Sequence, residues 1–127
     1  MSSKVKYAII GSGMMGREHI QNISLLDDTE VAALFGPDDE QLSLSAALAA
    51  NAAIYKDFRD LIKDTNVDAF VIASPNNTHI DILKEILPND NRAILAEKPL
   101  CTTVADCRTI AELAADYKAP IWVAMEY

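Results

Sequence analysis

Three glycines near the start of the chain, Gly11, Gly13 and Gly16, have the spacing Gly-x-Gly-x-x-Gly. An apolar segment, 5–10, precedes them, and a helical pattern, 14–26, follows. In that context the first glycine allows a tight strand-to-helix turn, the second lets a pyrophosphate approach the backbone, and the third lets helix and strand pack closely. The helix N-terminus adds free N–H groups and a positive dipole end. We therefore predict dinucleotide binding here rather than a turn that only needs small residues; the candidate residues are Gly11, Ser12, Gly13, Met14, Met15 and Gly16.

Polar side chains in the segment Ser74-Pro75-Asn76-Asn77 could act on the same ligand. The amides of Asn76 and Asn77 could hydrogen-bond a ribose or a carboxamide, although asparagine is also an ordinary turn residue. His79 follows two residues later, and it too could face the ligand. An exposed or locally hydrogen-bonded histidine is the interpretation that we favour for it.

Lys98, in the segment Glu97-Lys98-Pro99, is the strongest candidate for chemistry. A residue before proline is held away from helical geometry, so Lys98 is expected to be extended, and Pro99 is a candidate for a cis peptide bond. Glu97 and Lys98 then point in opposite directions, so that one can face a cleft while the other anchors the loop. A lysine placed so could orient a substrate hydroxyl or share its proton during hydride transfer. The alternative is an ordinary surface lysine.

The first helix offers further side chains for which structural roles are favoured. Arg17 could approach a pyrophosphate, but we expect it on a solvated helix face. Met14 and Met15 belong to the glycine segment, yet their side chains, like that of Ile20, fit packing better than a site. His19 lies on the same helix.

Strands and helices alternate along the whole chain, which indicates a parallel sheet with right-handed crossovers. Asp38 to Glu40 suit the first turn of a helix, Thr78 is expected to cap the fourth helix, and Thr102 or Thr103 the last. The fold class is therefore α/β, a doubly wound parallel sheet in the order 3-2-1-4-5-6. The predicted strands are 5–10, 30–35, 53–55, 68–73, 93–96 and 121–125, and the predicted helices are 14–26, 38–50, 58–63, 78–87 and 102–118.

The strand order places the three candidate segments at one edge of the sheet. The glycine segment follows the first strand, Ser74 to Asn77 follow the fourth, and Glu97 to Pro99 follow the fifth. These strands are neighbours at the centre of the sheet, and ligands of such sheets bind beyond the carboxyl ends of the strands. The sequence therefore predicts one site formed by all three segments.

Composition excludes several classes of partner. The chain has 127 residues, enough for one domain, and a net charge of −8, which argues against a nucleic-acid surface and an anionic membrane. No apolar run reaches the ~20 residues of a membrane span. The cysteines, Cys101 and Cys107, have no metal or redox spacing, and nothing indicates an activated thiol. We therefore expect no metal site and a cytoplasmic location.

The three segments together resemble the N-terminal half of the Gfo/Idh/MocA oxidoreductases. The resemblance rests on Gly11 to Gly16 with His19, on Ser74 to His79, and on Glu97-Lys98-Pro99-Leu100, and it extends from the first strand to Tyr127. It implies an NAD(P)-binding Rossmann domain, hydride transfer at a sugar or polyol carbon, and a motif lysine, here Lys98, near nicotinamide and substrate.

Two departures from the family pattern bear on cofactor and activity. Many members carry an acid at the end of the second strand, where this chain has Gly36; Asp38 could substitute. NADP needs a basic partner for its 2′-phosphate, whereas Asp38, Asp39 and Glu40 are acidic, so NAD is favoured. The second departure is that residue 127 lies where the family's C-terminal substrate domain usually begins, so we expect this chain to be the cofactor-binding half alone. We expect residues 1–127 to bind dinucleotide with little or no turnover, and to self-associate through exposed surface.

Two other functions stay open, and a third is disfavoured. The chain could be the cofactor-binding half of an NAD-dependent glycosidase of the same family, or a non-enzymatic dinucleotide-binding module, since either would carry the same residues. Methyl transfer from S-adenosylmethionine is disfavoured by the loop at Glu97 to Pro99.

Overall fold

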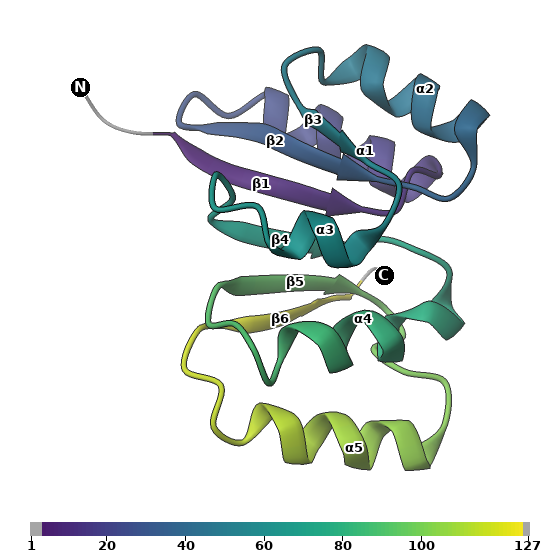
Figure 1. Ribbon diagram of the computed structural model, residues 1–127, viewed down its shortest axis with the longest axis vertical. Helices are drawn as coiled ribbons and strands as arrows, with labels where there is room; N and C mark the ends of the chain where they lie inside the picture. Colours follow the sequence, from purple (N-terminus) through teal and green to yellow (C-terminus); the bar gives the residue numbers. More distant parts are fainter. Residues whose placement is uncertain (1–3, 126–127) are drawn as a thin grey trace.

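A single parallel sheet forms the centre of the molecule. The computed structural model describes residues 4–125, and its six strands lie in the order β3-β2-β1-β4-β5-β6 (Figure 1). All five strand pairings are parallel, which confirms the predicted topology. The strands are β1 (Val5–Ile10), β2 (Thr29–Phe35), β3 (Ala53–Tyr55), β4 (Ala69–Ile72), β5 (Ala93–Glu97) and β6 (Ile121–Ala124).

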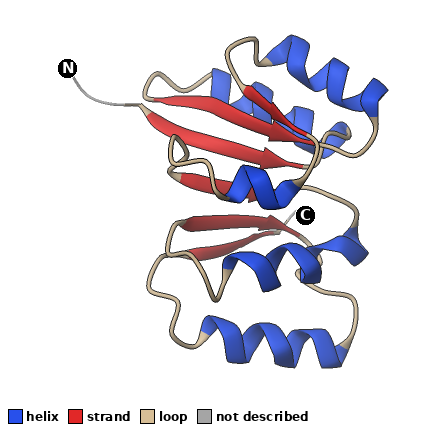
Figure 2. Cartoon of the chain, viewed as in Figure 1, coloured by secondary structure: helices blue, strands red, loops and turns tan. Residues whose placement is uncertain are grey.

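Helices connect successive strands and cover both faces of the sheet (Figure 2). The longest, α1 and α5, have 11 residues each, and within residues 4–125 no helix is long and apolar enough to cross a membrane. The helices are α1 (Met14–Ser24), α2 (Asp39–Leu48), α3 (Phe58–Ile62), the 3₁₀ helix η1 (Asn76–Thr78), α4 (His79–Ile86) and α5 (Val104–Ala114).

The core has two layers because neighbouring strand residues point to opposite faces of the sheet. Ile9 and Val71 pack with Ile20 of α1 and Leu42 of α2 on one face. On the other face Phe70 and its neighbours pack against apolar side chains of α3, α4 and α5. The central strands are buried on both faces, which explains why the sequence shows them as continuous apolar runs.

The ends of the helices differ from prediction where side chains form other contacts. The prediction of Thr78 as a cap is wrong: its hydroxyl donates to the Pro75 carbonyl (2.6 Å), lies 2.7 Å from Ser74 Oγ and does not cap α4. Thr103, one of the two expected caps of the last helix, does cap α5. Asp38, expected in the first turn of its helix, is instead the cap of α2. Helix α5 ends at Ala114 rather than near 118, because the following segment bonds to the loop before β5, where Asn91 Oδ1 accepts from two backbone N–H groups.

Candidate functional site

The three glycines of the loop after β1 have three different environments. Gly11 has φ +127°, and a Cβ built on it would lie 2.5 Å from the Ala73 carbonyl carbon. A Cβ on Gly16 would lie 2.1 Å from the Gly11 carbonyl oxygen, whereas one on Gly13 would have no neighbour within 4 Å. The first and third glycines are therefore required by the turn and by packing, and the second leaves open space for a ligand.

The carbonyl of Ser12 anchors the glycine loop to two helices. It accepts hydrogen bonds from Arg17 Nη1 of α1 (2.9 Å) and from the hydroxyl of Ser45 of α2 (3.0 Å). Arg17 also donates to Gln41 Oε1 (2.8 Å), so the expected solvated face for Arg17 is wrong. A trans peptide directs its C=O and N–H to opposite sides, so the N–H of Gly13 points away from this anchor. The loop carbonyl is thus used internally, and the N–H groups at the start of α1 remain for an anion.

A cleft of about 370 Å³ lies over the glycine loop. Met14 is 76% exposed and Met15 40% exposed at the edge of the cleft, so the expectation that their side chains serve packing is wrong, although Ile20 is buried as expected. Sequence reasoning did not single out Pro37, Gln41 and Ala73, which only tertiary structure brings here. The lining residues are Gly11, Ser12, Gly13, Met14, Met15, Pro37, Asp38, Gln41, Ala73, Ser74 and Pro75.

The end of β2 explains why Gly36 replaces an acid. A Cβ at Gly36 would lie 1.8 Å from Ser12 Oγ, so any side chain there would displace the glycine loop. Asp38, two residues later, is exposed, and its Oδ1 accepts from the Gln41 N–H (3.0 Å). A carboxylate is therefore available at the cleft from the helix cap instead of from the strand end.

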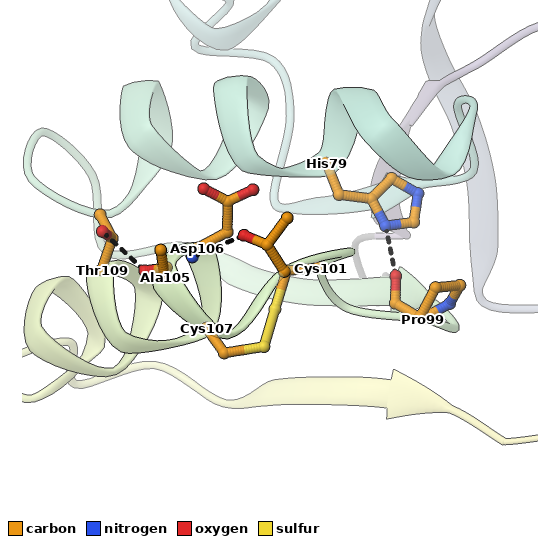
Figure 3. Close-up of a disulfide and its surroundings, with 8 residues drawn as sticks. His79, Pro99, Cys101, Ala105, Asp106, Cys107 and Thr109 are labelled. Carbon is orange, nitrogen blue, oxygen red and sulfur yellow. Dashed lines mark hydrogen bonds between the residues drawn. A yellow bond between two sulfur atoms is a disulfide. The ribbon is translucent and has the colours of Figure 1, made fainter.

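His79 joins the loops that follow β4 and β5. Its side chain is fully buried, with Nδ1 2.9 Å from the Pro99 carbonyl oxygen and Nε2 3.0 Å from the Ser74 carbonyl oxygen (Figure 3). Of the two alternatives expected for His79, exposure is wrong and local hydrogen bonding, to Ser74, is confirmed. The ring contacts two segments of the site rather than the cleft. Asn76 and Asn77 are exposed beside it on η1.

Glu97 and Lys98 have different environments at the end of β5. Glu97 Oε1 lies 2.6 Å from Nε2 of His19 on α1, and both side chains are largely buried. Lys98 and Pro99 are exposed, and the bond between them is cis, as predicted. Glu97 therefore anchors the loop to the helix of the glycine segment, and Lys98 has no ion-pair partner among residues 4–125. The partner of Glu97, His19, lies 78 positions away, and no local pattern indicates the pair.

The two cysteines form a disulfide, Cys101–Cys107, beside this loop (Figure 3). The sequence interpretation found no redox spacing in them, which the structure corrects. A separation of six residues resembles no standard motif, and the turn between the loop and α5 brings the two Cα atoms to 5.9 Å.

The parallel sheet, the glycine loop and the open helix N-terminus define an NAD-binding Rossmann domain. The chain belongs to the Gfo/Idh/MocA oxidoreductase family: residues 5–125 match the family model described as "Oxidoreductase family, NAD-binding Rossmann fold".

Relatives with known names are inositol dehydrogenases and similar proteins. The chain is 35% identical over 112 residues to inositol 2-dehydrogenase of Salmonella typhimurium, covering 85% of this chain and 32% of that protein. It is 29% identical over 123 residues to the rhizopine catabolism protein MocA of Rhizobium meliloti, covering 95% and 37%. Among solved structures, myo-inositol dehydrogenase from Lactobacillus casei, in complex with NAD(H) and myo-inositol, superposes with a TM-score of 0.88 at 31% identity, covering 95% of this chain and 36% of that one. This chain therefore spans about a third of the length of its relatives.

Proposed function

We propose that this chain holds NAD for hydride transfer to or from a carbon of a sugar, a polyol or a related small molecule. The observation that carries the proposal is the glycine loop, whose carbonyl is anchored inward while open space surrounds Gly13. Lys98 is exposed just after β5, which pairs with β4, the strand next to β1 and its glycine loop. The names of the relatives support a polyol such as inositol as the substrate class.

The residues of the cleft fit a dinucleotide. The loop at Gly11 to Gly16 would hold the pyrophosphate against the start of α1, and Asp38 would accept hydrogen bonds from the adenosine ribose. Gly36 would lie at the adenosine end, beside Asp38. The nicotinamide end would extend toward Asn76, Asn77 and Lys98, with Ser74, Pro75 and the loop at Glu97 and Pro99 shaping the walls. His79 would act through the two loops that it joins.

Lys98 is the residue that we propose for chemistry. NAD supplies the hydride acceptor or donor when it is bound. The ammonium group of Lys98 would donate a hydrogen bond to the oxygen on the reacting carbon, orienting the hydroxyl and sharing its proton as the carbonyl forms. Its neighbours hold it there, because Glu97 is bonded to His19 and the Pro99 carbonyl is bonded to His79.

Charge at the adenosine end favours NAD over NADP. Asp38, Asp39 and Glu40 are all exposed next to the end of β2, where a 2′-phosphate would lie. Repulsion between these carboxylates and the 2′-phosphate would weaken NADP binding, whereas the ribose hydroxyls of NAD can donate hydrogen bonds to Asp38. Asp39 pairs with Lys56, so the repulsion is assigned mainly to Asp38 and Glu40.

Substrate selection belongs, in this proposal, to a further domain. The relatives are about three times as long as the segment that they share with this chain, and we propose that their additional length supplies the substrate-binding groups and the acid/base residue. The edge strand β6, with Trp122 69% exposed, would contact that domain or a second copy in a homo-oligomer.

Fluorescence titration with NADH and NADPH tests cofactor binding on residues 1–127. We expect saturable NADH binding, weaker NADPH binding, and no effect of S-adenosylmethionine. Lys98→Met should change NADH affinity less than threefold, with the exposed Lys84→Met on α4 as the matched control. In a chain of the relatives' length, Lys98→Met should lower turnover of inositol by 10² or more, the range of general acid–base contributions. Absence of NADH binding at millimolar concentration would contradict the proposal.

A further inference from the structure

The disulfide Cys101–Cys107 connects the loop after β5 to the first turn of α5. Cys101 comes three residues after Lys98, and Cys107 follows the Thr103 cap of the helix. Figure 3 shows the disulfide and the His79–Pro99 hydrogen bond on the same short loop. The disulfide is therefore part of the structure that holds the proposed catalytic lysine, and neither the proposed function nor the family match uses it.

Three contacts anchor this loop, and Lys98 lies between them. Glu97 is bonded to His19 before the lysine, and the Pro99 carbonyl is bonded to His79 immediately after it. Cys101 provides the only covalent anchor among these contacts. Residues 102–105, between Cys101 and the body of α5, are all exposed, so no burial holds that segment if the disulfide opens.

The two cysteines differ in exposure. Cys107 is exposed on α5, whereas Cys101 is half-buried and packs against the main core beside Leu100. A thiolate from outside can therefore reach the sulfur of Cys107, and Cys101 is the natural leaving group. A disulfide with one half on an exposed residue has the character of a reversible bond rather than a permanent one.

We propose that Cys107 is a site of reversible thiol–disulfide exchange with a small thiol or a protein dithiol, and that reduction loosens the Lys98 loop and weakens dinucleotide binding. The proposal rests on the proposed function only for its second half. The first half concerns the chain itself, whatever ligand it binds.

The exchange proceeds in two balanced steps. An external thiolate attacks Sγ of Cys107, the Cys101–Cys107 bond breaks, and Cys101 leaves as a thiolate that takes up a proton. A second external thiolate then attacks the sulfur of the external group in the mixed disulfide, and Cys107 leaves as a thiolate. The protein gains two electrons and two protons, and the external dithiol is oxidised to its disulfide.

Reduction with dithiothreitol tests the proposal on residues 1–127. We expect the untreated protein to show no free thiols and the reduced protein to show two, by alkylation and mass measurement. Reduction should raise the NADH dissociation constant at least threefold and accelerate amide hydrogen exchange across 98–107 at least fivefold. Reoxidation should restore both values.

Two variants separate the disulfide from other effects of the reductant. Cys107→Ser should behave like the reduced protein under both conditions. Val104→Ala, which changes a side chain 68% exposed in the same segment, should respond to dithiothreitol as the unaltered chain does.

The outcomes are distinct. Two free thiols without reductant, or equal NADH affinity of the oxidised and reduced forms, would overturn the proposal. If neither form binds NADH, the proposed function fails, and amide hydrogen exchange decides the role of the disulfide. Faster amide exchange across 98–107 on reduction supports Cys107 as a site of thiol–disulfide exchange, and an unchanged amide exchange rate overturns it.

Discussion

The two ends of the sheet use the same device for different purposes. At the amino ends of β4 and β5, Arg92 donates to the carbonyls of Ile62, Asp64 and Val67 and pairs with Asp90. Its guanidinium also lies 4.4 Å from the ring centroid of Phe70. At the carboxyl ends, Arg17 and Ser45 together hold a single loop carbonyl, that of Ser12.

The difference lies in what each anchor leaves free. Arg92 closes its loops against the core, and burial, together with repulsion from Asp90, raises the pKa of the nearby Tyr117 to about 12. The anchors of the glycine loop instead occupy a carbonyl and leave N–H groups and open space at Gly13. We propose that the amino end of the sheet serves stability and the carboxyl end binding, in agreement with the carboxyl-end rule for such sheets.

The largest effect is expected from Arg92→Met. Removing a largely buried cation leaves several loop carbonyls without a donor and Asp90 without its ion-pair partner, which should cost about 3 kcal/mol in the free energy of unfolding. NADH affinity of the folded protein should not change. Urea unfolding and NADH titration measure the two quantities, with Arg92→Lys as an intermediate control. A loss of NADH affinity greater than threefold would break the division between the two ends.

The opposite result, a loss of NADH affinity without a loss of stability, is expected from Gly13→Ala. Since a Cβ at Gly13 meets no protein atom, the free energy of unfolding should stay within about 0.5 kcal/mol. The methyl group would occupy the space of the pyrophosphate, so NADH affinity should fall about tenfold, or ~1.4 kcal/mol. Gly11→Ala is the contrasting variant, because its φ of +127° and the close Ala73 carbonyl carbon should make it destabilising. Equal NADH affinity of Gly13→Ala and the unaltered chain would contradict the assignment of the site.

Acid sensitivity should belong to the Arg92 end of the sheet. Burial by itself would raise the pKa of Asp90, but hydrogen bonds from Arg92 and the Asn91 backbone outweigh it and lower that pKa below 3.8. A carboxylate whose pKa is lower in the folded than in the unfolded chain stabilises the fold at any pH above the unfolded-chain pKa. This stability is lost as the pH falls below about 4. Asp90→Asn should therefore cost about 1 kcal/mol at pH 7 and reduce the loss of stability between pH 5 and pH 3. An unchanged acid slope in urea unfolding would show that Asp90 is not responsible.

The smallest effect is expected from Asp38→Asn. Asparagine caps a helix as well as aspartate does, so the stability of α2 should be retained. Removal of one exposed negative charge should raise NADPH affinity about threefold, or ~0.7 kcal/mol. Asp39→Asn, whose carboxylate pairs with Lys56, is the control. An equal gain in both variants would indicate a general charge effect instead of a local one at Asp38.

Most of the scaffold of the site could be predicted, because its signals are local. Apolar runs between turn residues indicated the strands to within one residue, and the strand order placed the glycine loop, Ser74 and Lys98 at one edge. The cap at Thr103 was equally local. Thr78 shows the limit: the residue type suits a cap, but a 3₁₀ turn before α4 gave its hydroxyl other partners.

The amino-acid sequence by itself determined the fold class, the turn role of Gly11, the packing role of Gly16 and the presence of a lysine before a proline at the end of β5. These depend on backbone geometry and on periodicity over a few residues. Tertiary structure alone decided that Arg17 turns inward, that His79 is buried between two loops, that His19 meets Glu97 and that Cys101 joins Cys107. The physical reason is that the partner of a polar side chain is chosen by packing and by the need to satisfy buried groups, which neighbours in the chain do not reveal.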